Sequence, residues 1–214
     1  DTLTIVGDLC DFWLGSRSTE AELRACDGIT ALVNFRERGG SLNIMAGNHD
    51  LWLCSSYERI MGASIVEEPL DLVVEGLRLR LVHGHLLGAR GPSEAILESR
   101  AFFLGFGLLP RSIACRLDAR LAEKNARELL ADEERHLVVY RAYARELQGE
   151  ADIVILGHVH RPVDESGEHP RLIVLGGWQR GTSFLKIDRS GATFSARLEG
   201  PPAAEAATVL FKSR

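Results

Sequence analysis

The sequence has few of the features that mark secreted, membrane-spanning or nucleic-acid-binding chains. Its four cysteines contain no Cys-x-x-Cys pair, which argues against a disulfide framework and favours reduced thiols in a reducing compartment. No stretch reaches about 18 uncharged apolar residues, so no transmembrane helix is expected, and no signal-peptide pattern is visible either. A formal net charge of −5 argues against a general nucleic-acid binder, because phosphate backbones demand a basic surface.

What the sequence does contain is an ordinary globular composition, 45% hydrophobic and 26% charged over 214 residues. This length is enough for one well-buried domain over residues 1–214, with or without an appended subdomain. Apolar strand-like segments alternate with helical ones, which predicts an α/β fold of layered sheets flanked by helices. The predicted strands lie within LTIVGD, SLNIMAGNHD, the hairpin DLVVEGLRLRLVHGH, DIVILGHVH, RLIVLGG, SFLKID and TFSARL.

Turn and capping residues set the expected limits of two elements. Residues 19–38 predict one helix, with Thr19 and Glu22 as a capping box at its start and Gly39-Gly40 at its end. The hairpin is expected to turn at Glu75-Gly76.

Residues 86–149 interrupt the alternation with a long, mostly helical block. Its first part includes AFFLGFGLLP (101–110), which is dense in large apolar side chains, and its middle carries Arg116, Arg120 and Lys124 along one face of a helix. The block has the size of a lid or subdomain inserted between two strands of the core.

Four of the predicted strands end in polar clusters: GDLCD (7–11), GNHD (47–50), HGH (83–85) and GHVH (157–160). Ligands of open α/β sheets bind at the carboxyl ends of strands, so the clusters should converge on one site. Mixed oxygen and nitrogen ligation without thiolate suits Mn²⁺, Fe²⁺ or Zn²⁺. The candidate ligands are the carboxylate of Asp8, the amide of Asn48 and the imidazoles of His49, His83, His85, His158 and His160.

A single histidine at a strand end is usually an ordinary surface or core residue, and Gly-Asp or Gly-Asn by itself only marks a turn. Here five of the seven histidines fall in these clusters, and this joint occurrence favours a metal site. Asp8 is the natural bridge, since one carboxylate can hold two cations. Two metals about 3.5–4 Å apart clamp the attacking and leaving oxygens of a phosphoryl displacement.

In this order, GDLCD, GNHD, HGH and GHVH resemble the motifs of the calcineurin-like metallophosphoesterases. With GDLCDFWLG, the helical insert, GHVHRP and LGGWQRGTSFLKID, the chain is similar to UDP-2,3-diacylglucosamine hydrolases. The resemblance implies the calcineurin-like fold with a helical lid and an Mn²⁺-dependent pyrophosphatase of lipid A synthesis. Such an enzyme cleaves a UDP-linked diacyl sugar to the lipid monophosphate and UMP, in the cytoplasm at the inner membrane.

By this resemblance Asp8 bridges two divalent metals, Mn²⁺ first and Fe²⁺ or Zn²⁺ as alternatives. Asn48, His83 and His158 complete one metal, and His160 binds the other. The family's remaining ligands come from an Asp-x-His motif about one βα unit before GDLCD, which the sequence shown does not contain. We expect the chain to be part of a complete enzyme, the alternative being a protein that lacks this half-site.

We expect four residues that lie beside the proposed ligands in the sequence to have catalytic or supporting roles: His49, Asp50, His85 and Asp11. His49 would protonate the leaving oxygen or stabilise charge on the transferred group, with Asp50 orienting its imidazole. The alternative is that both only cap the following turn. His49 replaces an Arg found in many of the hydrolases, and His85 replaces an Asp, as a supporting group or spare ligand. Asp11 is expected to cap a helix or support the site rather than bind metal.

The insert is the expected substrate selector. Phe102, Phe103 and Phe106 would line an acyl-chain pocket or dip into an anionic membrane, although an ordinary buried helix explains them equally. Arg116, Arg120 and Lys124 would meet headgroups or the substrate diphosphate, or else form a solvated face paired with acidic neighbours. Two other functions stay open: a phosphoesterase acting on soluble nucleotides, and a non-catalytic binding module of the same fold. The oligomeric state is open as well.

Overall fold

The structure, a computed structural model, describes residues 1–10, 20–50, 54–88, 102, 105, 108–110, 113, 116, 133–167, 170–178 and 181–198. The chain divides into two compact units. The first unit comprises Asp1–Glu68 and His83–Val139, and the second comprises Pro69–Val82 and Tyr140–Arg214. Most of the predicted insert over 86–149 lies outside the described residues, so the single domain with an insert stays a prediction.

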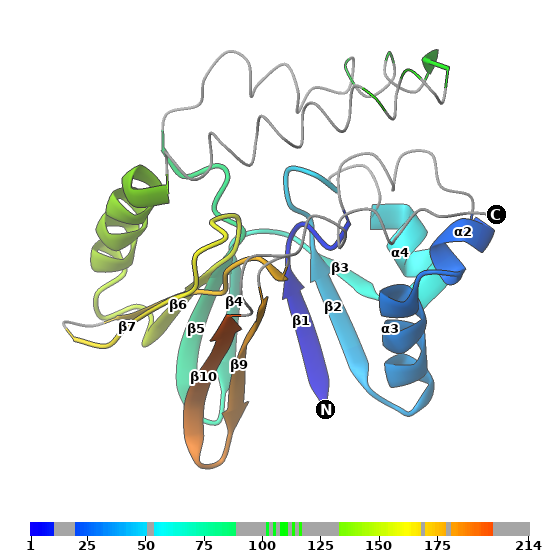
Figure 1. The fold of residues 1–214 in the computed structure, drawn as a ribbon. Helices are drawn as coiled ribbons and strands as arrows, with labels where there is room; N and C mark the ends of the chain where they lie inside the picture. The colour runs from blue at the N-terminus through cyan, green and yellow to red at the C-terminus, as the bar shows by residue number, and fades with distance from the viewer. Residues whose placement is uncertain are drawn as a thin grey trace. The chain divides into compact units, whose positions relative to one another are not determined.

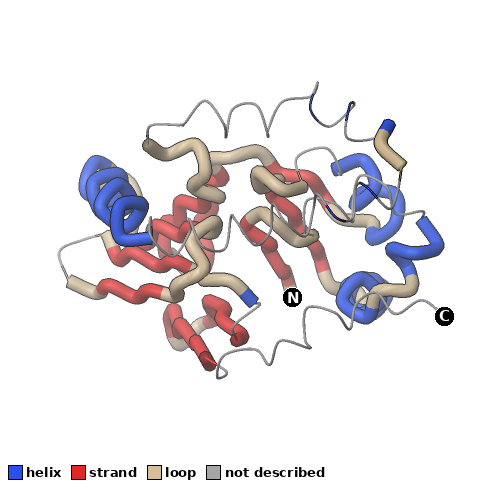
Figure 2. The backbone as a smooth tube through the Cα atoms, turned by 45° about the horizontal axis from the view of Figure 1, so that its top comes forward, coloured by secondary structure: helices blue, strands red, loops and turns tan. Residues whose placement is uncertain are grey.

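A three-stranded parallel sheet forms the centre of the first unit, in the order β1-β2-β3. Its strands are β1 (Thr2–Val6), β2 (Ser41–Met45) and β3 (Ser64–Val66). The β2 side chains Leu42, Ile44 and Met45 are almost completely buried. Figures 1 and 2 show the helices within residues 20–37 and 54–61 gathered beside the sheet. Because the strands are parallel, their carboxyl ends, and the loops that follow, lie at one edge.

The segment predicted as one helix over 19–38 is two helices, α2 (Glu20–Arg24) and α3 (Asp27–Glu37). The backbone is extended at Cys26, and Asp27 occupies the first turn of α3. Asp is a poor residue for a helix interior but a favourable one near a helix N-terminus, so the chain restarts there. Gly39 ends α3 as predicted, in the left-handed region with φ +89°.

Two strands and one helix of the structure were not predicted. These are the short strands β3 and β7 (Val163–Glu165) and the helix α4 (Cys54–Met61). In α4 the buried side chains Tyr57, Ile60 and Met61 recur at helical spacing and join a core that includes Leu42 and Ile44. The strands are only three residues long, which is too short for a periodic pattern to be recognised.

The second unit contains a five-stranded mixed sheet in the order β4-β5-β6-β8-β7 and a separate hairpin of β9 and β10. The β4–β5 hairpin turns as predicted at Glu75 and Gly76, which both have positive φ. All four side chains of β6 are buried, as expected for an interior parallel strand. The remaining bounds are β4 (Leu70–Val74), β5 (Leu77–Val82), β6 (Ile153–Leu156), β8 (Arg171–Val174), β9 (Gly181–Asp188) and β10 (Gly191–Leu198).

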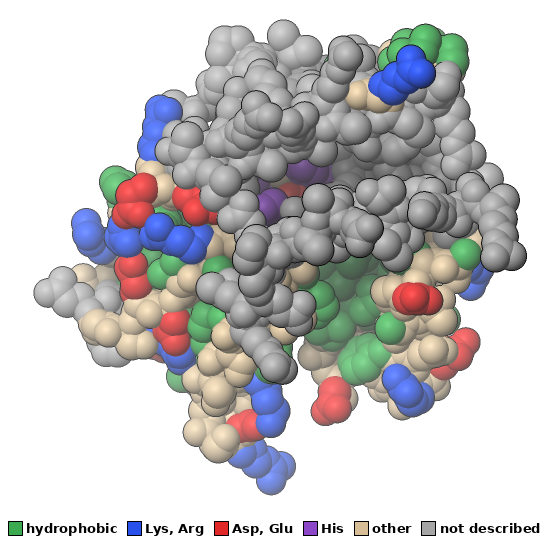
Figure 3. Space-filling model, in the orientation of Figure 1, with side chains coloured by type: hydrophobic (Ala, Val, Ile, Leu, Met, Phe, Trp, Pro, Cys, Tyr) green, Lys and Arg blue, Asp and Glu red, His purple; other side chains and the backbone are tan. Residues whose placement is uncertain are grey.

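Charged side chains on the second unit are largely paired, and Figure 3 shows acidic and basic side chains interspersed on one face among the described residues. Arg78 pairs with Asp152 and Arg171 with Asp164, each at 2.7 Å. Exposed pairs of this kind each contribute about 0–1 kcal/mol to the free energy of unfolding.

The predicted α/β class is confirmed by these sheets and helices. A further helix covers residues 133–146, with buried side chains at Leu137, Tyr140 and Ala144 along one face. None of the helices in the described part of the chain is long and apolar enough to cross a membrane. Neither Cys10 nor Cys26 is part of a disulfide in the described part of the chain.

Candidate metal centre

Two polar loops of the first unit leave neighbouring parallel strands at the same edge of the sheet. Val6, the last residue of β1, lies opposite Met45, the last residue of β2. Asp8 follows β1 by two residues, and Asn48 follows β2 by three. The register therefore places the carboxylate and the amide side by side, as the sequence predicted for these motifs.

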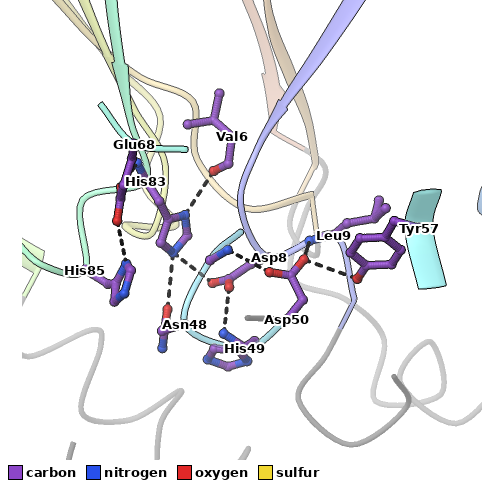
Figure 4. Close-up of polar contacts among 11 residues, drawn as sticks. Val6, Asp8, Leu9, Asn48, His49, Asp50, Tyr57, Glu68, His83 and His85 are labelled. Atoms are coloured by element: carbon purple, nitrogen blue, oxygen red, sulfur yellow. Dashed lines mark hydrogen bonds and ion pairs between the residues drawn. The ribbon is translucent and has the colours of Figure 1, made fainter. Parts of the chain in front are cut away.

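The ring of His83 is buried and is held from several directions (Figure 4). Its Nδ1 donates a hydrogen bond to the carbonyl oxygen of Val6 at 2.9 Å. Its Nε2 lies 3.2 Å from Oδ1 of Asn48 and 3.3 Å from Oδ2 of Asp8. A carbonyl oxygen only accepts, so Nδ1 carries a proton, and Nε2 is the nitrogen directed at the two oxygens.

Asp8 is fixed through both oxygens of its carboxylate. Oδ1 accepts the backbone N–H of His49 at 2.9 Å, and Oδ2 faces Nε2 of His83. Burial by itself raises the pKa of Asp8, but the charge of His83 and hydrogen bonds from His83 and His49 outweigh it. The pKa of Asp8 is therefore held well below its usual range, and its carboxylate is anionic at neutral pH.

The donor set fits a divalent cation. Asp8, Asn48 and His83 direct two oxygens and one ring nitrogen toward one another, with the opposite ring nitrogen of His83 fixed on Val6. A second hydrogen bond of this kind sets the tautomer and the orientation of a metal-binding histidine. Carboxylate, amide and imidazole ligands together suit Mn²⁺, Fe²⁺ or Zn²⁺, and the set does not select among them.

Two glycines make this close approach of side chain and backbone feasible. A Cβ on Gly7, whose φ is +83°, would lie 2.1 Å from Nδ1 of His83. A Cβ on Gly47 would lie 2.1 Å from Oδ1 of Asp8. Neither distance is compatible with a side chain, so the Gly before Asp8 and the Gly before Asn48 are required by the site itself.

Asp50 does not have the contacts that the sequence predicted for it. Instead of orienting the His49 imidazole, its fully buried carboxylate accepts the backbone N–H groups of Leu9 at 2.8 Å and Gly47 at 2.7 Å, and the hydroxyl of Tyr57 at 3.2 Å. Burial and the charge of Asp8 raise the pKa of Asp50, while the two backbone hydrogen bonds lower it. Asp50 thus joins the two loops that carry Asp8 and Asn48.

Replacing Asp50 with Ala should lower the free energy of unfolding by roughly 3 kcal/mol, because buried donors on both loops lose their acceptor. Urea unfolding measures this loss. Glu58→Ala is the matched control, since Glu58 lies exposed on α4, next to Tyr57, and its loss should change stability by less than about 0.5 kcal/mol. Equal stability of the two variants would contradict the assigned role.

Glu68, two residues after β3, is a contact that the sequence analysis missed. Its Oε2 accepts the backbone N–H of His83 at 2.7 Å, and its Oε1 lies 3.6 Å from Nδ1 of His85. His85 was predicted as a supporting group or spare ligand, and its ring centre lies 5.1 Å from that of His83. Nothing in the sequence distinguishes Glu68 from the adjacent Glu67, so no pattern could have identified it.

The second unit carries the other two predicted ligands, His158 and His160, directly after β6. His158 has φ +57°, and a 2.7 Å hydrogen bond from Val159 N to Gly157 O closes a tight turn around it. The carbonyl of His160 accepts the backbone N–H of Gly177 at 3.0 Å. Of the three non-glycine residues with positive φ in the described part, two are Asp8 and His158, and such backbone strain clusters at functional sites.

The remaining predicted site residues belong to the insert or to the segment after β1. Phe102 is half-buried and Arg116 is exposed. The residues that lie outside the described part are Asp11, Phe103, Phe106, Arg120 and Lys124.

Comparison with known proteins extends the motif resemblance over most of the chain. UDP-2,3-diacylglucosamine hydrolase from Nitrosococcus oceani is 29% identical over 208 residues, covering 91% of this chain and 81% of that protein. The enzyme of the same name from Xanthomonas axonopodis pv. citri is 28% identical over 212 residues, covering 90% and 84%. No family model matches the chain.

Similarity to solved structures is weaker. A structure of a novel archaeal phosphodiesterase has 14% identity and a TM-score of 0.44, over 92% of this chain and 83% of that one. The sequence homology and the converging ligand atoms of the first unit support a metal-dependent hydrolase. The resemblance predicted from the sequence motifs is confirmed. This chain, which carries the metallophosphoesterase motifs, is a distant homologue of the UDP-2,3-diacylglucosamine hydrolases over most of its length.

Proposed function

We propose that this protein hydrolyses the pyrophosphate of UDP-2,3-diacylglucosamine, with divalent metal, to 2,3-diacylglucosamine 1-phosphate and UMP. The observation that carries the proposal is the convergence of Asp8 Oδ2 and Asn48 Oδ1 on Nε2 of His83, at 3.3 and 3.2 Å. The substrate is taken from the name of the distant relatives that align over about nine tenths of this chain.

The proposed centre holds two cations, with Mn²⁺ as the first candidate and Fe²⁺ or Zn²⁺ as alternatives. Asp8 would bind both cations. One cation would also be bound by Asn48, His83 and His158, and the other would also be bound by His160. The inclusion of His158 and His160 rests on the motif resemblance, in which GHVH supplies ligands just after a buried strand, as it follows β6 here.

Divalent cations held there would supply the Lewis acidity that polarises a phosphoryl oxygen and activates water. His49 would protonate the leaving oxygen or stabilise charge on the transferred group, because its backbone N–H is fixed on Asp8 beside the ligands. Asp50 would serve this reaction by holding the Asp8 and Asn48 loops together.

Selection of a lipid substrate is assigned to the insert. Phe102, Phe103 and Phe106 would bind acyl chains, and an apolar face beside cationic residues suits a membrane surface. The cationic residues Arg116, Arg120 and Lys124 would meet the diphosphate or anionic headgroups. The protein would then work in the cytoplasm, peripherally at the inner membrane.

Removal of the acyl chains should lower kcat/KM at least about tenfold, because binding energy from remote parts of a substrate contributes to its turnover. The full-length protein is assayed with Mn²⁺ on UDP-2,3-diacylglucosamine and on the deacylated sugar nucleotide. EDTA should abolish both activities, and added Mn²⁺ should restore them. Equal turnover of the two substrates would contradict lipid selectivity.

A phosphoesterase acting on soluble nucleotides or phosphodiesters is the second candidate, favoured by His49 where the hydrolases often carry Arg. It predicts faster hydrolysis of bis(p-nitrophenyl) phosphate than of the lipid nucleotide. A non-catalytic binding module predicts no hydrolysis of either, and fewer than two Mn²⁺ per chain in metal analysis.

A further inference from the structure

The backbone of the HGH segment is anchored by an acidic side chain that belongs to none of the four metal motifs. Glu68 accepts the N–H of His83 at 2.7 Å, and only 15% of the Glu68 side chain is exposed. His83 itself is fully buried. A buried N–H with no acceptor is costly, and a carboxylate forms a stronger hydrogen bond to it than a neutral acceptor would.

His83 is thereby held at both its backbone and its ring. Glu68 fixes the N–H, and the Val6 carbonyl fixes Nδ1 at 2.9 Å. These two contacts come from the segments after β3 and at the end of β1, and together they direct Nε2 at Asn48 and Asp8 (Figure 4). Rotation of the ring about its Cα–Cβ bond would need the Val6 hydrogen bond to break, and displacement of the backbone would need the Glu68 hydrogen bond to break.

The second carboxylate oxygen of Glu68, Oε1, lies near His85, the other histidine of the HGH segment. Oε1 lies 3.6 Å from Nδ1 of His85, which is within ion-pair range but too long for a hydrogen bond. The rings of His83 and His85 are tilted by 54° with centres 5.1 Å apart. One carboxylate therefore contacts both histidines of HGH while facing the His83 backbone rather than its Nε2.

We propose that Glu68 is a positioning residue, whose hydrogen bond to the His83 backbone presets Nε2 for metal binding. This role rests on the proposed function, because it assumes that the Asp8, Asn48 and His83 atoms hold a cation. Glu68 acts on Nε2 through the backbone of His83. The role therefore needs a hydrogen-bond acceptor on a side chain long enough to reach the His83 N–H. Loss of such outer partners typically weakens metal affinity about 10- to 100-fold.

Three substitutions separate the contribution of the side-chain length at position 68 from that of its charge. Glu68→Ala removes the acceptor and should raise the Mn²⁺ dissociation constant about 10- to 100-fold. Glu68→Gln keeps an amide oxygen at the same reach and should stay within about threefold of the wild type. Glu68→Asp keeps the charge but shortens the side chain by one methylene, so it should bind weakly like the Ala variant. Glu67→Ala, at the exposed neighbouring carboxylate, is the control and should bind like the wild type.

Two measurements on the full-length protein test the role. Calorimetry gives the Mn²⁺ dissociation constant, and NMR hydrogen exchange of the His83 amide in metal-free protein reports the anchor directly. Exchange should be faster in the Ala and Asp variants and slow in the wild type, Gln and Glu67→Ala proteins. If the Ala variant does not fold, the contrast between Gln and Asp carries the test.

Wild-type affinity and slow exchange in Glu68→Ala or Glu68→Asp would overturn the proposal. Weak binding by Glu68→Gln equal to that of the Ala variant would also overturn it, since charge rather than the hydrogen bond would then matter. If the wild type itself binds no Mn²⁺, the proposed function fails, and the exchange of the His83 amide still decides whether Glu68 anchors that backbone.

Discussion

Asp8→Asn is expected to weaken Mn²⁺ binding by the full-length protein, and its hydrolytic activity, by at least about 100-fold. Outer partners of metal ligands already account for about 10- to 100-fold, so loss of a charged ligand should exceed that. Asn has nearly the shape of Asp and tolerates the positive φ of +53° at this position, so the backbone should remain in place. Its amide oxygen can still accept the N–H of His49, and what is removed is the anionic oxygen beside His83.

The effect of Asp8→Asn is measured by Mn²⁺ titration calorimetry, by hydrolysis assays and by urea unfolding of the metal-free protein. Asp27→Asn is the matched control, because Asp27 lies exposed in the first turn of α3, in the same unit. It should bind metal and hydrolyse substrate like the wild type. Wild-type metal affinity in Asp8→Asn would show that Asp8 is not a ligand.

Gly7→Ala is expected to abolish metal binding and to destabilise the protein more than a positive φ alone explains. The new Cβ would lie 2.1 Å from Nδ1 and 2.6 Å from Cγ of His83. Relief of this overlap must move the ring and break its hydrogen bond to Val6. Nε2 would then lose its direction toward Asp8 and Asn48, so the ligand set is lost even if the fold survives.

Gly39→Ala separates backbone strain from this collision. Gly39 has φ +89°, close to the +83° of Gly7, but a Cβ there would meet nothing within 4 Å. The strain of a left-handed alanine should cost about 1–2 kcal/mol in both variants. Overpacking should cost Gly7→Ala roughly 1–3 kcal/mol more, and only Gly7→Ala should lose Mn²⁺ affinity. Equal stability and equal metal binding in urea unfolding and calorimetry would contradict the packing of His83 against Gly7.

Much of the fold was predictable because its signals are local. β1, β2 and β6 are apolar runs that end in Gly and a polar residue, and the Glu75-Gly76 turn is a two-residue hairpin signal. The break between α2 and α3 was missed because the apolar spacing continues through Cys26, where the backbone is nevertheless extended. Strand β3 was missed because three residues hold no usable period.

The proximity of Asp8, Asn48 and His83 followed from the sequence, whereas the roles of Asp50 and Glu68 did not. Residues after parallel neighbouring strands share an edge, which explains why Asp8 and Asn48 lie together. His83 follows β5 of another sheet, so its place beside them was expected from the motif set and not from strand neighbourhood. Asp50 was assigned to His49, its neighbour in the chain, but its carboxylate contacts Leu9, which is 41 positions away. A polar side chain in a loop has several candidate partners, and local sequence cannot choose among them.

By itself, the sequence determined the α/β class and the ligand-type residues at the strand ends, because both depend on periodicity and chain order. Only the tertiary structure decided which atom meets which. The Val6 carbonyl and the His83 ring are 77 residues apart, and Glu68 and the His83 N–H are 15 apart. Hydrogen bonds form only within a few tenths of an ångström of their optimal length, and the packing of distant segments sets those distances.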